Sequence, residues 1–140
     1  MTSPRLFAAV LVGLFALIAP IAVYAETAPA AAATEARAKV LDFSNETELN
    51  ALAAEGRTVV FFFASWCPNC RATVAELNAR WSEVDPTLTL VIADYDKERE
   101  LKGKFGVTYQ DTFVLLDAAG NAIKSWNAGG VDGLNANSKL

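Results

Sequence analysis

The sequence predicts a single α/β domain in which a mixed β-sheet carries helices on both of its faces. Three observations support this fold class. Short apolar runs alternate with helix-like segments, the runs are continuously apolar as in strands covered on both sides, and a turn joins the last two strand-like runs. Alternation gives parallel strands and the last pair gives an antiparallel hairpin, so we expect the order β-α-β-α-β-α-β-β-α.

The first predicted strand covers residues 40–43, and a helix follows it. Ser44 or Asn45 can cap this helix, because Glu48 lies three residues after Asn45, as in a capping box. Gly56 is expected to end the helix, since glycine is the residue most often found just past a helix C-terminus.

A buried strand followed directly by the longest helix forms the centre of the domain. Residues 58–64 are β-branched, aromatic and continuously apolar, which favours a strand covered on both faces. Pro68 fits the first turn of a helix, where its missing N–H costs nothing, so we expect a helix over 68–84. The apolar side chains that recur at helical spacing along it are Val74, Leu77, Trp81 and Val84.

The next predicted unit is a second buried strand over residues 88–93, followed by a short helix over 97–104. Asp96 is expected to cap this helix, because aspartate is a favoured residue immediately before the first turn. Gly103 and Gly106 are expected to break it.

A hairpin and a last helix complete the expected fold. The strands cover residues 112–116 and 122–126, the turn covers 117–121, and residues 131–139 allow only a short helix. The aromatic side chains that we expect in the core or on the sheet faces are Phe61, Phe62, Phe63, Trp81 and Trp126.

The N-terminal segment predicts export. Residues 1–25 read as a signal peptide, with Arg5 before an uncharged apolar run and small residues before a cleavage point after Ala25. The same run is long enough to span a bilayer, so an uncleaved anchor is the alternative. Residues 26–39 form an alanine-rich linker, and the folded domain is expected over 40–140. Both alternatives place that domain in the periplasm or another extracytoplasmic space, where disulfides persist.

Composition excludes several classes of chemistry. The 140 residues contain no histidine and two cysteines, so histidine-dependent triads, histidine-ligated metals and four-thiolate zinc or iron–sulfur sites within one chain are excluded. The net charge of −4 argues against a nucleic-acid partner. We therefore expect no cofactor and no metal site.

The two cysteines, Cys67 and Cys70, lie in a C-x-x-C spacing at the start of the central helix. Unpaired N–H groups and a partial positive charge at a helix N-terminus stabilise a thiolate, which predicts Cys67 as an attacking thiol and Cys70 as the thiol that resolves the mixed disulfide. Two alternatives stand beside this redox pair. One is a plain stapling disulfide, and the other is a metal site completed by a second chain.

The chain resembles the thioredoxin family over residues 40–140. The resemblance rests on ASWCPNCR at 64–71 after a buried strand, on the strand that leads to Asp96, and on TFVLLDAAG at 112–120. It implies a solvent-exposed Cys67 and a shielded Cys70. It also implies that Trp66 belongs to the substrate-facing surface, against the alternative of a core filler. Between the cysteines stand Pro68 and Asn69, a dipeptide that differs from the family's usual Gly-Pro and bears on the redox potential.

Three positions depart from what the family implies. Asp111 replaces the cis-proline expected just before Thr112, a buried acid is replaced by Phe61, and a buried lysine is replaced by Ile92. A cis bond before a non-proline residue costs about 3 kcal/mol, so a trans peptide is expected at Asp111. Its carboxylate then either lies near the cysteines, raising the Cys67 pKa or accepting a proton, or faces water at the strand entry.

The function that these residues predict is an extracytoplasmic thiol–disulfide oxidoreductase that exchanges electrons with protein disulfides, in the direction of a reductant. Its partners are protein thiols and disulfides, with no nucleic acid, no membrane except through an N-terminal anchor, and a monomeric state. The alternative is a non-catalytic binding module, in which the surface around Trp66 and residues 110–112 holds a partner and the disulfide is structural.

Overall fold

The computed structural model describes residues 36–139, so the predicted signal peptide lies outside the described residues. The elements follow the predicted order, with one short 3-10 helix added after the central helix. In chain order they are β1 (Lys39–Asp42), α1 (Glu46–Glu55), β2 (Thr58–Phe63), α2 (Pro68–Arg80), η1 (Trp81–Glu83), β3 (Thr89–Asp94), α3 (Arg99–Phe105), β4 (Thr112–Leu116), β5 (Ala122–Asn127) and α4 (Gly130–Asn137).

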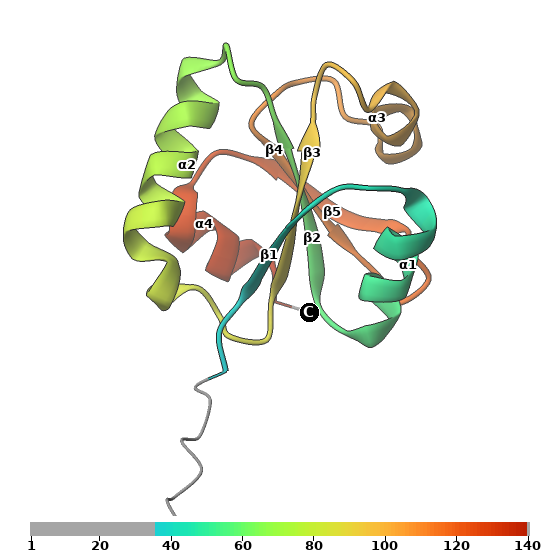
Figure 1. Ribbon diagram of the computed structural model, residues 1–140, viewed down its shortest axis with the longest axis horizontal. Helices are drawn as coiled ribbons and strands as arrows, with labels where there is room; N and C mark the ends of the chain where they lie inside the picture. Colours follow the sequence, from blue (N-terminus) through green and yellow to red (C-terminus); the bar gives the residue numbers. More distant parts are fainter. Residues whose placement is uncertain (1–35, 140) are drawn as a thin grey trace, which may run out of the picture. The chain divides into compact units, whose positions relative to one another are not determined.

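The strands form one mixed sheet in the order β1-β3-β2-β4-β5. Strands β1, β3 and β2 run parallel, whereas β4 is antiparallel to both β2 and β5. Helices α2 and α4 cover one face of the sheet, and α1 and α3 cover the other (Figure 1). The predicted α/β class with helices on both faces is confirmed.

Alternation along β2 supplies side chains to both cores. Val59 and Phe61 point into the cluster under α2 and α4, while Val60 and Phe62 point into the cluster under α1 and α3. All four are fully buried, as a strand covered on both faces requires. The Phe61 ring stacks on Phe113, with ring centroids 4.3 Å apart.

The start of α1 confirms the predicted cap. The Asn45 side chain accepts a hydrogen bond from the Glu48 N–H at 2.9 Å, and the Ser44 hydroxyl donates to the Glu48 carboxylate. The Gly56 N–H donates to the Leu52 carbonyl at the other end, so this helix ends where the sequence predicts.

The start of α3 does not follow the prediction. Asp96 does not cap this helix; its carboxylate accepts a hydrogen bond from the Trp66 indole at 2.8 Å. The preceding turn is held by Asp94, whose Oδ1 accepts the N–H groups of Asp96 and Lys97 at 3.0 and 3.2 Å. The side chain that organises this turn is therefore the last residue of β3, and α3 begins later than predicted.

The end of α3 shows why only one of its two glycines acts as a breaker. Gly103 lies inside the helix, whereas Gly106 forms its C-cap in the left-handed conformation, with φ 65°. A residue without a Cβ is favoured there, so Gly106 marks the real helix end.

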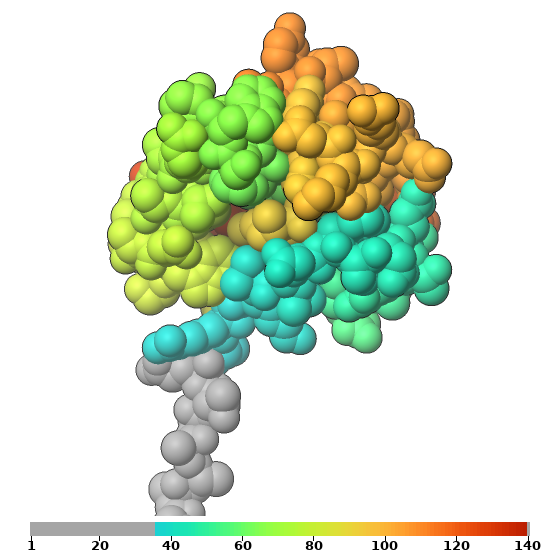
Figure 2. Space-filling model, turned by 45° about the horizontal axis from the view of Figure 1, so that its top comes forward, coloured from blue at the N-terminus to red at the C-terminus, as the bar shows by residue number. Residues whose placement is uncertain are grey.

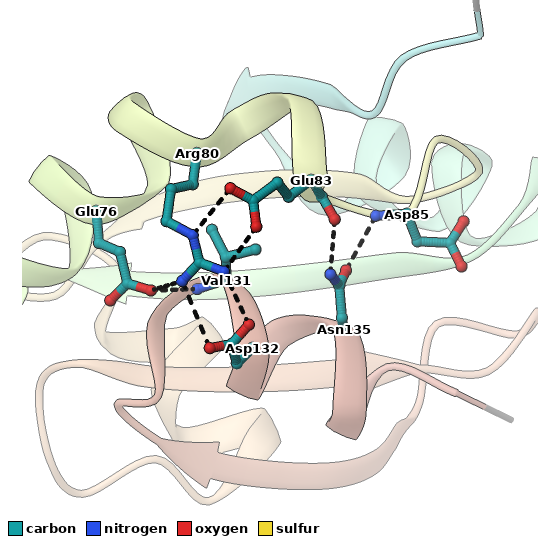
Figure 3. Close-up of polar contacts among 7 residues, drawn as sticks. All are labelled: Glu76, Arg80, Glu83, Asp85, Val131, Asp132 and Asn135. Carbon is teal, nitrogen blue, oxygen red and sulfur yellow. Dashed lines mark hydrogen bonds and ion pairs between the residues drawn. The ribbon is translucent and has the colours of Figure 1, made fainter.

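The C-terminal half of α2 is fastened to α4 by an ion-pair network (Figure 3). The Arg80 guanidinium contacts Glu76 at 2.9 Å, Glu83 at 2.7 Å and Asp132 at 3.0 Å. The Glu76 carboxylate also accepts the N–H of Val131 in the first turn of α4, at 3.2 Å. A carboxylate at a helix N-terminus is stabilising, so Glu76 serves both the ion pair and the helix end.

A second connection extends this network toward the sheet. The Asn135 side chain donates to the Glu83 carbonyl at 2.7 Å and accepts the Asp85 N–H at 2.9 Å (Figure 3). The Asp85 carboxylate pairs with Arg57, just before β2, at 2.6 Å. The chain after α2 is thereby tied to α4 and to the start of the central strand, which fixes the direction of α2.

An apolar groove of about 460 Å³ opens between α2 and β1, with β3 at its floor. Figure 2 shows this hollow between the yellow-green atoms of α2 and the cyan atoms of β1. Ile92, which stands where the family places a lysine, lines it together with Phe63. Within residues 36–139, no helix combines the length and the apolar character needed to cross a membrane.

Candidate functional site

The two cysteines lie where the chain leaves β2 and enters α2, at the upper end of α2 in Figure 1. The Cys67 N–H donates to the Ala64 carbonyl at 3.1 Å, which closes the turn between strand and helix. Cys67 has an extended backbone and is the N-cap residue, and Pro68 follows in the first turn. The chain thus places Cys67 at the helix N-terminus, as predicted, and Cys70 one turn further along.

Cys67 uses its sulfur as the capping atom of α2. Its Sγ accepts a hydrogen bond from the Cys70 N–H at 3.3 Å. This hydrogen bond is the main cause that lowers the Cys67 pKa below its ordinary value, and burial opposes it. The Asn69 N–H and the Gln110 side chain lower the pKa further. Asn69 therefore tunes the thiol through its main chain rather than through its amide.

Cys67 is less exposed than the resemblance implies. The residue exposes 3% of its surface and Cys70 exposes none, so the prediction of a solvent-exposed Cys67 is wrong. The reason is the capping geometry, which turns the Cys67 sulfur back onto the first turn of α2. The order of exposure is kept, since Cys70 is the more deeply buried thiol, and both are free thiols in this structure.

Cys70 has the opposite acidity. Burial raises its pKa to about 11, and the neighbouring Cys67 and Asp111 charges raise it as well. The pKa values of the two thiols in this C-x-x-C segment are thus shifted in opposite directions. Cys67 is shifted toward the thiolate, and Cys70 remains a protonated thiol at neutral pH.

Asp111 lies beside this pair and not in water. Its peptide is trans, because the described residues contain no cis peptide bond, and its backbone is left-handed with φ 60°. The residue exposes only 4%, so the alternative of a solvent-facing carboxylate is wrong. Its N–H donates to the Phe62 carbonyl at 3.0 Å, and its carbonyl accepts the Ala128 N–H at 3.1 Å, which hold the turn against β2.

The charge of Asp111 acts on the thiol that the sequence did not single out. It raises the pKa of Cys70, whereas the Cys67 pKa is lowered by groups that do not include Asp111. Burial in turn raises the pKa of the Asp111 carboxyl, opposed by a hydrogen bond from the Thr73 hydroxyl. Of the alternatives stated for a carboxylate near the cysteines, the raised pKa therefore falls on Cys70, while the Cys67 pKa is lowered overall.

Thr112 has a structural part in the site. Its hydroxyl donates to the Tyr109 carbonyl at 2.7 Å and accepts the Asn127 side-chain N–H at 2.7 Å. These bonds close the turn that carries Asp111 and join it to β5. Thr112 thus positions Asp111, and its hydroxyl bonds to Tyr109 and Asn127 rather than to a cysteine.

Two exposed aromatic residues flank the site. Trp66 exposes 56% of its surface, which overturns the alternative of a core filler, and its indole N–H is held by Asp96. Tyr109 exposes 69% and lies two residues before Asp111. Large apolar groups exposed beside a reactive thiol give a partner protein a surface to pack on.

Sequence reasoning missed Tyr109 and Thr73. Nothing in the sequence distinguishes an exposed tyrosine of a loop from a buried one. Thr73, in contrast, lies three residues after Cys70, and side chains at that spacing share a helix face. That spacing was a usable signal for a polar group beside the resolving thiol.

The described residues of one chain do not form a set of metal ligands. Residues 36–139 contain no group of three or more histidine, cysteine, aspartate or glutamate side chains placed to hold an ion. The site consists instead of two thiols, a buried carboxylate and a hydroxyl, all of which are proton donors or acceptors.

Comparisons with known proteins agree with this arrangement. The family model described as Thioredoxin matches residues 39–137. A thioredoxin of Aspergillus fumigatus is 36% identical over 80 residues, covering 55% of this chain and 70% of that protein. The thioredoxin of Bacillus subtilis is 29% identical over 73 residues, covering 52% of this chain and 70% of that protein. The solved structure of Malassezia sympodialis thioredoxin superposes with a TM-score of 0.61 at 18% identity, covering 74% of this chain and 94% of that one, and supports the fold.

Proposed function

This chain belongs to the thioredoxin family and is a thiol–disulfide oxidoreductase, and from this premise we propose that it reduces protein disulfides outside the cytoplasm through Cys67 and Cys70. The observation that carries the proposal is the division of acidity at the start of α2. One thiol has a lowered pKa and its neighbour has a pKa raised to about 11.

In the proposed reaction, the Cys67 thiolate attacks one sulfur of a partner disulfide. A mixed disulfide forms, and the other partner sulfur leaves with the bonding electron pair and takes up a proton. The Cys70 sulfur then attacks Cys67, its proton is released, and the second partner sulfur leaves as a thiol. Two electrons have passed from the dithiol to the partner, and the pair ends as an intramolecular disulfide.

The small size of the domain supports the reducing direction. Elements β1 to α4 follow one another without an inserted substrate-binding domain among residues 36–139. Such a domain can meet folded partners through a small contact around Trp66 and Tyr109, which suits transient electron transfer. We expect it to act as a monomer, which sedimentation of the purified protein checks.

The compartment is supported by the sequence of the first 25 residues. We propose that residues 1–25 direct export and are cleaved after Ala25, that 26–39 form a linker and that 40–140 form the catalytic domain. N-terminal sequencing of the protein recovered from the periplasm of a Gram-negative host tests this. Glu26 at the N-terminus is expected, and full-length protein in the cytoplasm overturns the proposal.

Trapping separates catalysis from binding alone. Cys70→Ser is expected to accumulate a mixed disulfide with insulin whose disulfides are intact, because Cys67 attacks and no second thiol resolves the product. Cys67→Ser is expected to form none and to reduce insulin no faster than the uncatalysed reaction. Retained activity in Cys67→Ser overturns the proposed function. Retained partner binding by a Cys67→Ser, Cys70→Ser variant with retained biological activity favours the binding module instead.

A further inference from the structure

Resting on the proposed function, we propose that Asp111 accepts the proton of the Cys70 thiol in the step that resolves the mixed disulfide. The proposal assigns to a residue on the turn before β4 a role that Phe61 on β2 and Ile92 on β3 cannot perform, because neither side chain titrates.

The need for an acceptor follows from the burial of Cys70. The residue exposes no surface, and its thiol is protonated at neutral pH. It has to lose this proton as its sulfur attacks Cys67, and a fully buried thiol has no direct path to bulk water. Phe61 and Ile92 stand where the resemblance implies an acid and a lysine, and Phe61 is stacked on Phe113. Neither can take the proton.

The geometry brings the Asp111 carboxylate to the same face of α2 as Cys70. Thr73, three residues after Cys70 on the same helix face, is buried with only 6% exposed and lies close enough to Asp111 for its hydroxyl to lower the pKa of that carboxyl. The backbone of Asp111 is held by hydrogen bonds to Phe62 and Ala128, and the residue exposes only 4% of its surface. Its Oδ1 is buried and has no hydrogen-bond partner among the described residues. That oxygen is a free acceptor in an otherwise apolar setting.

The electrostatics agree with the geometry. The titratable group of α2 that responds to the Asp111 charge is Cys70, and the Asp111 carboxylate has no salt bridge among residues 36–139. Burial without a counter-ion raises the pKa of the carboxyl. A carboxylate with a higher proton affinity is a better acceptor for a thiol, because the difference between the two acids is smaller.

The step balances as follows. The Cys70 proton moves to Asp111 while the Cys70 sulfur forms a bond to Cys67 Sγ. The bond between Cys67 and the partner sulfur breaks, and the partner sulfur leaves with the electron pair. The protonated Asp111 then gives its proton to the departing thiolate or to water. The dithiol is oxidised, and the partner disulfide is reduced.

Asp111→Asn tests the proposal because asparagine has the same shape and tolerates a positive φ. The probe is 5,5′-dithiobis(2-nitrobenzoate), which releases one coloured thiolate when Cys67 attacks and a second when Cys70 resolves the mixed disulfide. At neutral pH the variant is expected to slow the second release about tenfold or more and to leave the first nearly unchanged. Asp132→Asn, on α4 beside the C-terminal end of α2, is the matched control and is expected to change neither.

The sign of the effect separates proton transfer from a purely electrostatic role. Removing the Asp111 charge lowers the Cys70 pKa, so electrostatics alone predict a faster second release. A second release that is unchanged or faster at neutral pH therefore overturns the proposal. Above the pKa of Cys70, where no acceptor is needed, the variant is expected to equal the wild type. Asp111→Gly, which also accepts φ 60°, gives the same readout if the asparagine variant does not fold. Absence of the first release in the wild type contradicts the proposed function instead.

Discussion

The carboxylates beside the two ends of α2 have opposite environments. At the C-terminal end, Glu76, Glu83 and Asp132 surround the Arg80 guanidinium, and the pKa of Glu83 is lowered by this partner. At the N-terminal end, Asp111 is more deeply buried, has no counter-ion among the described residues, and has a raised pKa. One helix thus has an end where paired charge stabilises the fold and an end where unpaired charge is available for chemistry.

The backbone repeats this contrast. Each end has a left-handed residue, Gly130 opposite the C-terminal half of α2 and Asp111 opposite its start. Gly130 lies against the Glu76 carboxylate, in a space that a Cβ would fill. Asp111 adopts a similar φ with a side chain, which costs free energy. The strained conformation at Asp111 places a functional carboxylate, whereas that at Gly130 serves close packing.

The largest expected effect is that of Asp111→Pro. Proline fixes φ near −65° and has no N–H, whereas Asp111 has φ 60° and donates to Phe62. The proline that the family resemblance implies at this position is therefore expected to lower the free energy of unfolding by about 3 kcal/mol or more. Urea denaturation measures this, with Asp111→Gly as the control that keeps φ accessible. A proline variant as stable as the wild type contradicts the described turn.

The next largest effect is expected at the opposite end, for Gly130→Ala. The added Cβ meets the Glu76 carboxylate at a positive φ, so we expect a loss of about 2 kcal/mol in the free energy of unfolding. Gly103→Ala is the matched control, because its Cβ enters open space inside α3 and is expected to stabilise by up to about 1 kcal/mol. Thermal unfolding compares the two, and equal effects would remove the distinction between these glycines.

A smaller loss is expected for Arg80→Gln, because its ion pairs are partly exposed and screened by salt. The folded pKa of Glu83 is lowered, so its stabilisation is present above the ordinary value of 4.5 and is lost as pH falls through the lowered value. The difference in melting temperature between variant and wild type is therefore expected near neutral pH and should shrink at about pH 3. A difference that does not depend on pH contradicts the electrostatic account of this end.

The smallest effect has the opposite sign. Asp111 has a raised folded pKa, so the cost of its buried charge is present above that pKa and disappears as pH falls below the ordinary value of 3.8. Asp111→Asn is expected to raise the melting temperature of the reduced protein near neutral pH and to leave it unchanged at about pH 3. A variant that is less stable than the wild type at neutral pH shows that the carboxylate has a counter-ion.

Patterns within one segment of chain predicted most of the fold. Continuous apolar runs located β2 and β3, and the capping box at Asn45 located α1, because these signals depend on neighbouring residues. The failures involve partners far apart in the sequence. The Asp96 carboxylate accepts a hydrogen bond from Trp66, thirty positions away, and therefore does not cap α3.

The site shows the same division between local and distant contacts. The roles of Cys67 and Cys70 follow from a strand-to-helix turn that is visible in the sequence. The burial of Cys67 depends on its sulfur folding back as a cap, and the position of Asp111 depends on how the turn before β4 packs on α2. The sequence could therefore state two alternatives for Asp111 but could not choose between them.

The central claim is that the two thiols at the start of α2 have opposite acidities, and the pH dependence of their alkylation tests it most directly. Mass spectrometry after brief treatment of the reduced protein with iodoacetamide gives a separate rate for each cysteine. We predict that Cys67 reaches half of its maximal rate below its ordinary pKa of 9.0, while Cys70 reacts only as pH approaches about 11. Reaction of Cys70 first, or of both thiols together near 9.0, would contradict the account.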